Sequence, residues 1–316
     1  MAQFGRAPVW GTGGRWFESS HLDHTVAILM PIQQTRQMIA VCAQPRSGSN
    51  MLCDLVSQVG YENHAEYFSP GMNVSELQKM TGGRLPAAAF LRCQKVVVKI
   101  PLGMAEAVCD VLACHFNIRP VCVYRPNAVQ QAISLLLAQI TGKYAHVSGS
   151  VGDRFWQVGF PRALCAFGDA EKKQETQIRG KLLEDDRFAE KAACASLHIM
   201  SGCVSFFLGA VAQFEGIFQD TLRVNFDDLV ANPGAQIERI TGTKKPGARP
   251  CTERQSDSLN HRIYEQALLR MTAEETTWFT GGWVQWLGAH EVPQVSSFID
   301  RVPVVTVGDL TKENGV

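Results

Sequence analysis

The segment from Ala43 to Asn50 reads A-Q-P-R-S-G-S-N and contains residue types that can bind an anion. It aligns with the phosphate-loop pattern G-x-x-x-x-G-K-[ST] when the second glycine is placed at Gly48. Ala43 then replaces the first glycine, Ser49 the lysine, and Asn50 the hydroxyl residue that would bind Mg²⁺. A turn at Gly48 before a helix would still direct several N–H groups at one phosphate-like group, with Arg46 supplying the charge. The alternative is a capping turn that carries a surface arginine.

A second group with the chemistry of an anion site lies further along the chain. Arg125 ends a run of β-forming residues, and Ser134 lies on the second to third turn of the helical pattern that follows. Together, a guanidinium and a hydroxyl supply the charge and the directed hydrogen bonds that bind a monophosphate. Separately, each is ordinary, because a helical serine commonly bonds its own backbone and a strand-end arginine is commonly solvated. Two anion sites at two strand ends favour a nucleotide that is phosphorylated at both ends.

The elements that would position these residues alternate between strands and helices. Short apolar runs typical of buried parallel strands cover residues 39–42, 96–98, 121–123 and 222–224. Helical periodicity follows at residues 51–59, 103–116, 127–141 and 227–240, and a long helix is predicted at 187–214. This alternation predicts an α/β fold, a three-layer α/β/α sandwich with a central, mostly parallel sheet. Residues 148–185 lack a clear pattern and are predicted to form a surface excursion or lid.

The composition of the chain is that of a globular protein. Its 316 residues are 46% hydrophobic, and 30 Lys and Arg balance 30 Asp and Glu. With no net charge, the protein as a whole is not attracted to nucleic acid or to an anionic membrane, so we expect neither as a partner. The ten cysteines lack a C-x-x-C pair and favour buried free thiols. The apolar stretch 199–214 is shorter than a spanning helix and no secretory signal is recognised, so we expect a cytoplasmic protein without a transmembrane segment.

The first 37 residues do not share the pattern of the rest. Trp16 to Ser19 can be encoded by TGG TTC GAA TCC, which contains the T-arm sequence of a tRNA gene. We therefore expect residues 1–37 to be an artefact of a wrongly assigned start site, with the biological start at Met30 or Met38, and a disordered arm is the alternative. The remaining chain is expected to form one domain over residues 38–290 and a C-terminal tail over residues 291–316.

Six segments, in this order along the chain, carry a resemblance to a known family: Gln44–Cys53, Glu66–Phe68, Val98–Lys99, Tyr124–Ser134, Gln139–Gly142 and Asn225–Pro233. In them the sequence resembles the bacterial trehalose 2-sulfotransferase family, from about Met38 to Gly242. The resemblance implies a P-loop NTPase-like sulfotransferase fold. It also implies 3′-phosphoadenosine-5′-phosphosulfate (PAPS) as co-substrate and a small carbohydrate or other hydroxyl acceptor, and homodimers are known in this family. In-line sulfuryl transfer of this kind needs no metal ion, because the enzyme mainly positions the reactants and stabilises charge.

The resemblance also implies roles for individual residues. The 5′-phosphosulfate would be held by Arg46, Ser47, Gly48, Ser49 and Asn50, and the 3′-phosphate by Arg125 and Ser134. Arg46 would also stabilise charge on the leaving phosphate, and Glu66 would be the general base that activates the acceptor hydroxyl. The chain departs from the family at Asn50, where Ser or Thr is usual, and at Pro126–Asn127.

Several other residues have two interpretations each. His64 is a rival general base, and Lys99 could reach the sulfate or simply be solvated. Asp227 and Asp228 are expected to cap a helix, and three tryptophans near residue 280 favour packing over a sugar-binding platform. A small-molecule kinase and a non-catalytic nucleotide-binding protein are the alternative functions.

Overall fold

The computed structural model of the chain describes residues 36–64, 93–100, 112–141, 169–250, 258–289 and 296–312. Its centre is a five-stranded sheet in the order β2-β3-β1-β4-β5, and every neighbouring pair is parallel. The strands are β1 (Gln37–Ala43), β2 (Glu62–Asn63), β3 (Lys95–Lys99), β4 (Asn117–Tyr124) and β5 (Leu222–Asn225). The predicted α/β class and parallel sheet are confirmed, and the two-residue β2 is the strand that the sequence patterns missed.

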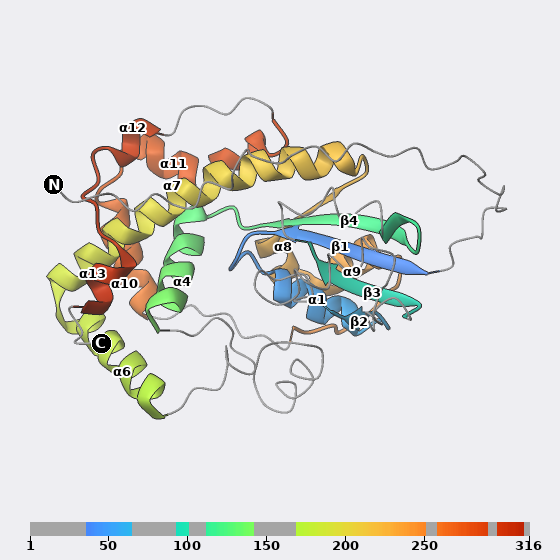
Figure 1. Cartoon of the computed structure of the whole chain (residues 1–316), viewed down its shortest axis with the longest axis horizontal. Coiled ribbons are helices and arrows are strands. Elements are labelled where there is room, and N and C mark those ends of the chain that lie inside the picture. The colour runs from blue at the N-terminus through green and yellow to red at the C-terminus, as the bar shows by residue number, and fades with distance from the viewer. Residues whose placement is uncertain are drawn as a thin grey trace, which may run out of the picture. The chain divides into compact units, whose positions relative to one another are not determined.

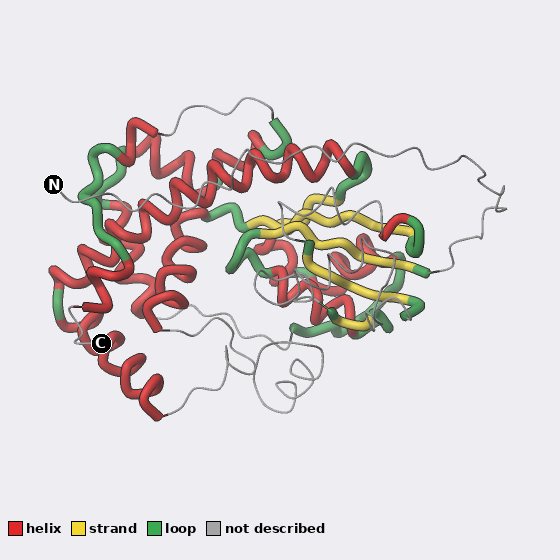
Figure 2. Tube along the Cα trace, viewed as in Figure 1, coloured by secondary structure: helices red, strands yellow, loops and turns green. Residues whose placement is uncertain are grey.

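Helices cover both faces of the sheet (Figure 1 and Figure 2), as predicted. Alternate residues of β1 explain this, because Met38 and Ala40 point into one buried core and Ile39 and Val41 into the other. On the Ile39 side lie α1 (Ser49–Ser57), α8 (Phe226–Ala231) and α9 (Pro233–Thr241). On the Met38 side lie α4 (Ala128–Thr141), α6 (Asp169–Glu184), α7 (Asp186–Ile217) and α10 (Ser258–Leu268).

Two helical predictions require correction. The single helix expected at 227–240 is two helices, α8 and α9, because Pro233 has no N–H to continue a helix and instead occupies the first turn of α9. The excursion expected at 148–185 contains α6, whose many charged residues obscured its periodicity. The helix expected at 103–116 lies mostly outside the described residues.

The C-terminal residues belong to the domain core. They form α11 (Ala273–Thr280), the 3₁₀ helix η4 (Gly282–Trp286), α12 (Ser296–Ile299) and α13 (Val307–Lys312). Phe298 and Leu310 are buried in the same core as α4 and α7. The domain therefore extends beyond residue 290, and the described part of 291–316 is not a separate tail. Residues 1–35 lie outside the described part of the chain, so the expected artefact there stays a prediction.

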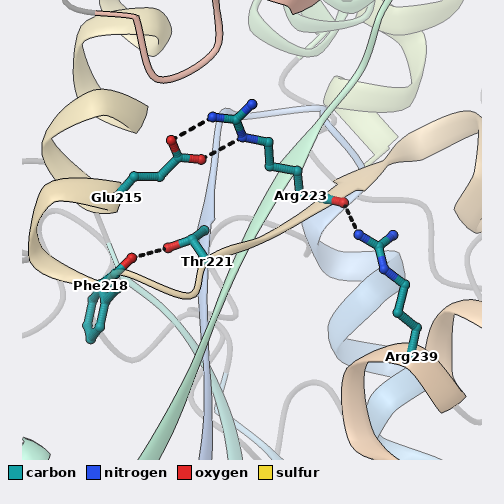
Figure 3. A network of polar contacts seen from close by, with 5 residues as sticks. All are labelled: Glu215, Phe218, Thr221, Arg223 and Arg239. Carbon is teal, nitrogen blue, oxygen red and sulfur yellow. Dashed lines mark hydrogen bonds and ion pairs between the residues drawn. The ribbon is translucent and has the colours of Figure 1, made fainter.

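The end of α7 is fixed to the edge of the sheet by a polar clamp (Figure 3). Arg223 on β5 donates two hydrogen bonds of 2.7 Å to the carboxylate of Glu215 on α7. Arg239 on α9 donates to the Arg223 carbonyl at 2.8 Å. Because the guanidinium and carboxylate pair in a bidentate geometry, the clamp fixes direction as well as distance. It thereby joins helices from both faces to β5.

Helix α7 is long and apolar enough, by length and composition, to cross a membrane. However, 56% of its apolar window is buried inside the protein, where Phe207 and Phe214 pack in the core. This agrees with the predicted buried helix. The cysteines of the described residues are likewise free thiols, most of them buried.

Candidate functional site

The predicted phosphate-binding loop lies where two adjacent strands send their chains to opposite faces of the sheet. β1 leads into α1 on one face, and β4, which pairs with β1 along its whole length, leads into α4 on the other. In parallel α/β sheets, such a divergence opens a crevice at the carboxyl ends of the strands, where ligands bind. The residues after β1 and β4 are therefore brought together, as the sequence predicted.

The loop backbone has an unusual conformation. Arg46 and Gly48 have φ values of 66° and 97°, and Ser47 between them is fully buried. The Ser47 hydroxyl donates to the Gln44 carbonyl at 2.8 Å, and the Leu52 N–H donates to the Gly48 carbonyl at 3.0 Å, which closes the first turn of α1. Successive left-handed and turn residues before a helix form a concave backbone surface of the kind that binds anions.

Gly48 is required by space as well as by backbone conformation. A Cβ atom placed on Gly48 would lie 2.3 Å from Cδ2 of Phe226, the first residue of α8. A side chain at this position would therefore push the aromatic ring or the loop out of place. The loop lies directly against the Phe226 ring.

Arg46 and Ser134, predicted to contact opposite ends of a nucleotide, are hydrogen-bonded in the structure. The Arg46 Nε–H donates to the Ser134 hydroxyl oxygen at 3.0 Å. Burial lowers the pKa of Arg46 from its usual 12.5, but a guanidinium stays protonated under physiological conditions. The two predicted anion sites are thus one connected group of side chains and not two separated pockets.

Arg125 completes this group from the end of β4. Its guanidinium carbon lies 4.9 Å from the centre of the Phe226 ring, within cation–π distance. Its Nη2 donates to the side-chain oxygen of Gln130 at 3.2 Å. Arg125 and Gly48 of the phosphate-binding loop therefore contact the same aromatic ring.

Lys99 brings a third positive charge to the loop, from the neighbouring strand. Lys99 on β3 pairs in register with Val41 on β1, and its ammonium donates to the Asn50 side-chain oxygen at 2.8 Å. Burial lowers the pKa of Lys99 to about 8. The ammonium thus lies at the start of α1, bonded to the residue that follows Ser49, and Ser49 occupies the lysine position of the phosphate-loop pattern. In the sequence, the only indication of this role was the position of Lys99 at the end of a predicted strand.

Two glutamines that sequence reasoning missed hold the loop in place. Gln131 on α4 donates from Nε2 to the Gln44 side chain at 2.8 Å and to the Pro45 carbonyl at 3.0 Å. Gln44 in turn donates to the carbonyl of Cys203 on α7. Both glutamines are buried, a strong indication of a structural role for polar side chains. The loop is therefore anchored to the helices of the Met38 face.

The remaining predicted residues have varied outcomes. Glu66 lies outside the described residues. His64, the rival base, is buried at the end of β2, and this burial lowers its pKa. Asp227 and Asp228 lie in the first turn of α8, but the cap is Asn225, whose side-chain oxygen accepts from the Asp227 N–H at 2.8 Å. The predicted cap, Asp227 or Asp228, is thus wrong, and Asn225 caps the helix instead.

The residues around Pro126 have structural roles. Asn127 caps α4, since its side-chain oxygen accepts from the Gln130 N–H at 2.9 Å. The indole of Trp283 is fully buried and donates to the Pro126 carbonyl at 2.7 Å. Its ring also meets those of Tyr124 and Phe207 edge to face, so for this tryptophan the packing interpretation is confirmed. These contacts fix the chain between Arg125 and α4.

Comparisons of the chain with protein-family models, with curated proteins and with solved structures find no match. The chemistry of the site must therefore be inferred from its own residues. Two guanidinium groups, an ammonium and a serine hydroxyl lie on or around one turn at a helix N-terminus, at the carboxyl ends of the strands. This set is suited to a ligand that carries several negative charges.

Proposed function

We propose that the protein is a PAPS-dependent sulfotransferase that acts on a hydroxyl of a carbohydrate or another small metabolite. The observation that carries this proposal is the linked cationic group at the carboxyl ends of β1 and β4. Arg46 bonds Ser134, and Arg125 stacks on the Phe226 ring that Gly48 contacts. These residues coincide with the segments that resemble the bacterial trehalose 2-sulfotransferases.

The proposed reaction is an in-line transfer. The acceptor oxygen forms a bond to sulfur while the bond from sulfur to the bridging phosphate oxygen breaks, and 3′,5′-adenosine bisphosphate leaves. The acceptor proton passes to a base, for which Glu66 is the candidate by resemblance. Arg46 and the amides at the start of α1 would stabilise the charge that grows on the leaving phosphate. The sulfuryl group ends on the acceptor oxygen. The protein returns to its starting state when the base releases the proton to solvent.

When a ligand binds, either the Arg46–Ser134 hydrogen bond breaks, or it remains and both side chains also bond a phosphate. The Ser134 hydroxyl can donate to a phosphate oxygen while the guanidinium of Arg46 contacts the same or the adjacent phosphate. A doubly phosphorylated ligand would therefore replace one internal hydrogen bond with several charge-assisted ones. We infer that a ligand with one phosphate group binds more weakly than 3′,5′-adenosine bisphosphate.

A kinase is the second candidate, because Lys99 supplies an ammonium where the loop itself has Ser49. The same contact also argues against this function. Asn50 occupies the position of the Mg²⁺-binding hydroxyl residue, and its side-chain oxygen accepts from the Lys99 ammonium at 2.8 Å. A divalent cation at that oxygen would face the positive charge of Lys99 at short range. The site therefore favours an anionic ligand without magnesium.

Calorimetry with 3′,5′-adenosine bisphosphate and with ATP–Mg²⁺ tests the proposal directly. We expect the bisphosphate to bind more tightly, and Arg125→Ala and Ser134→Ala to weaken it by about 1–3 kcal/mol each. Arg119→Ala is the matched control, because Arg119 lies in the first half of the same strand, β4, and its side chain contacts α9. Tighter binding of ATP–Mg²⁺ would overturn the proposal in favour of a kinase.

The acceptor can be found by a transfer assay. Labelled sulfate from PAPS should appear on a hydroxyl compound in a screen that begins with trehalose and other glucosides. Glu66→Gln should keep its affinity for the bisphosphate and lose turnover. If PAPS binds normally but no acceptor is sulfated, the protein is a nucleotide-binding protein without this activity.

A further inference from the structure

Three side chains with metal-binding atoms meet between β2 and the start of β3. They are Glu62 on β2, His64 immediately after it and Cys93 shortly before β3, and their ligand atoms all lie within 4.8 Å of one another. The His64 Nε2 atom is 3.9 Å from the Cys93 sulfur and 3.9 Å from a Glu62 carboxylate oxygen. His64 thus lies at the centre of the group.

The sheet holds two of the three residues in place. Glu62 pairs with Val96 across the two strands, and the His64 N–H donates to the Val97 carbonyl at 2.9 Å. The backbone that carries Glu62 and His64 is therefore held by the β2–β3 ladder. Cys93 lies two residues before β3 begins.

The spacing is close to that of a tetrahedral zinc site. Bonds of about 2.3 Å to sulfur and about 2.0–2.2 Å to nitrogen and oxygen place neighbouring ligand atoms roughly 3.4–3.6 Å apart. The two 3.9 Å separations from His64 exceed this by a few tenths of an ångström, and the Glu62 and Cys93 ligand atoms lie within 4.8 Å of each other. Metal binding would therefore draw the three side chains closer together.

The donor types and their burial select the class of metal. Thiolate and imidazole ligands bind Zn²⁺ and late transition metals and are unsuited to Mg²⁺ or Ca²⁺. His64 and Cys93 are buried, whereas the Glu62 side chain is 62% exposed. A cation can therefore enter from the Glu62 side, and the three protein ligands leave one coordination position to water.

We propose that Glu62, His64 and Cys93 form a binding site for Zn²⁺ or a chemically similar transition metal that links β2 to the start of β3. Binding replaces the proton of the Cys93 thiol with the metal and releases that proton to solvent. The ion would cross-link positions 29 residues apart in the chain. Because it would bind the folded chain more tightly than the unfolded one, the metal would stabilise the fold.

Titration with Co²⁺, followed by its displacement with Zn²⁺, tests the site. The full chain, first treated with a chelator, should bind one Co²⁺ with a thiolate-to-cobalt absorption in the near ultraviolet, and Zn²⁺ should abolish this absorption. Zn²⁺ should also raise the melting temperature, because it binds only the folded chain tightly. Absence of the thiolate absorption at one equivalent of Co²⁺ would overturn the proposal.

Two variants and a control assign the ligands. Cys93→Ser should lose the thiolate absorption, and Cys114→Ser, which changes an exposed free cysteine, should keep it. Glu62→Gln alters an exposed side chain and should fold normally. We expect its affinity for Co²⁺ to be at least about tenfold lower. This variant therefore tests the site even if Cys93→Ser is unstable. Unchanged affinity in Glu62→Gln, or unchanged absorption in a folded Cys93→Ser, would contradict the assignment.

Discussion

Arg46 holds a left-handed backbone conformation that residues other than glycine seldom adopt. Such a conformation costs on the order of 1–3 kcal/mol and persists only where surrounding contacts enforce it. Here the buried Ser47 hydroxyl bonds the Gln44 carbonyl, and Gln131 bonds the Pro45 carbonyl. The strain is thus concentrated on the residue whose guanidinium is directed at Ser134. Local strain and the proposed anion chemistry coincide at one residue.

Replacing Gly48 with alanine separates backbone strain from close packing. We expect Gly48→Ala to lower the free energy of unfolding by more than the roughly 1–2 kcal/mol typical of a left-handed alanine, because its Cβ would also lie 2.3 Å from the Phe226 ring. Gly60→Ala is the control, since Gly60 has a φ of 90° but open space around it. Urea unfolding of both variants measures the difference. Equal losses would show that the Phe226 ring moves aside at no cost.

Lys99 should make nucleotide binding depend on pH. Burial lowers its pKa to about 8, so in the free protein the ammonium loses its proton as the pH rises through that value. A bound anion favours the charged form and raises this pKa, so binding is coupled to proton uptake. We therefore expect the affinity for 3′,5′-adenosine bisphosphate to fall as the pH rises above about 8.

Lys99→Met removes the titrating group and should flatten this dependence in calorimetric titrations. Lys95→Met is the matched control, because Lys95 begins the same strand, β3, and its ammonium lies over the Tyr61 ring. The role of Lys99 is refuted if the affinities of Lys99→Met and the unaltered chain fall in parallel with pH.

At the scale of elements, α4 positions the phosphate-binding loop through Gln131. Gln131→Leu removes two hydrogen bonds to Gln44 and Pro45 in a buried setting and should cost about 1–3 kcal/mol of stability. It should also weaken bisphosphate binding, because the loop loses its anchor. Gln139→Leu changes an exposed position of the same helix and should leave both properties nearly unchanged. If binding by Gln131→Leu is normal, the loop keeps its shape without α4.

Local patterns were sufficient for four strands and for placing the anion-binding residues at one edge of the sheet, but they predicted two separate sites where Arg46 and Ser134 are in fact bonded. Apolar runs predicted the four longer strands, and the parallel order then brings Arg46 and Ser134 to one edge of the sheet. Contacts that depend on tertiary packing left no local signal. Gln44 meets α7 across 159 residues, and β2 is too short for a pattern. Cys93 and His64 likewise become neighbours only through the β2–β3 pairing.

Two cores, one on each face of the sheet, give the whole domain its stability. β1 contributes to both and pairs with β3 and β4, so its first residues matter to the entire sheet. The Asn117 N–H donates to the Arg36 carbonyl, and the Gln37 N–H to the Gln94 carbonyl, each at 2.8 Å. The Tyr61 hydroxyl donates to the Gln37 side chain at 2.9 Å.

A chain shortened to begin at Met38 would lose all three of these hydrogen bonds, whereas one that begins at Met30 retains the residues that form them. At about 1 kcal/mol for each bond, we expect the Met38 chain to be about 2–3 kcal/mol less stable in urea unfolding. Both chains keep every residue proposed for the anion site, so bisphosphate binding to the folded protein should be similar. Equal stability of the two chains would show that the sheet does not need the residues before Met38.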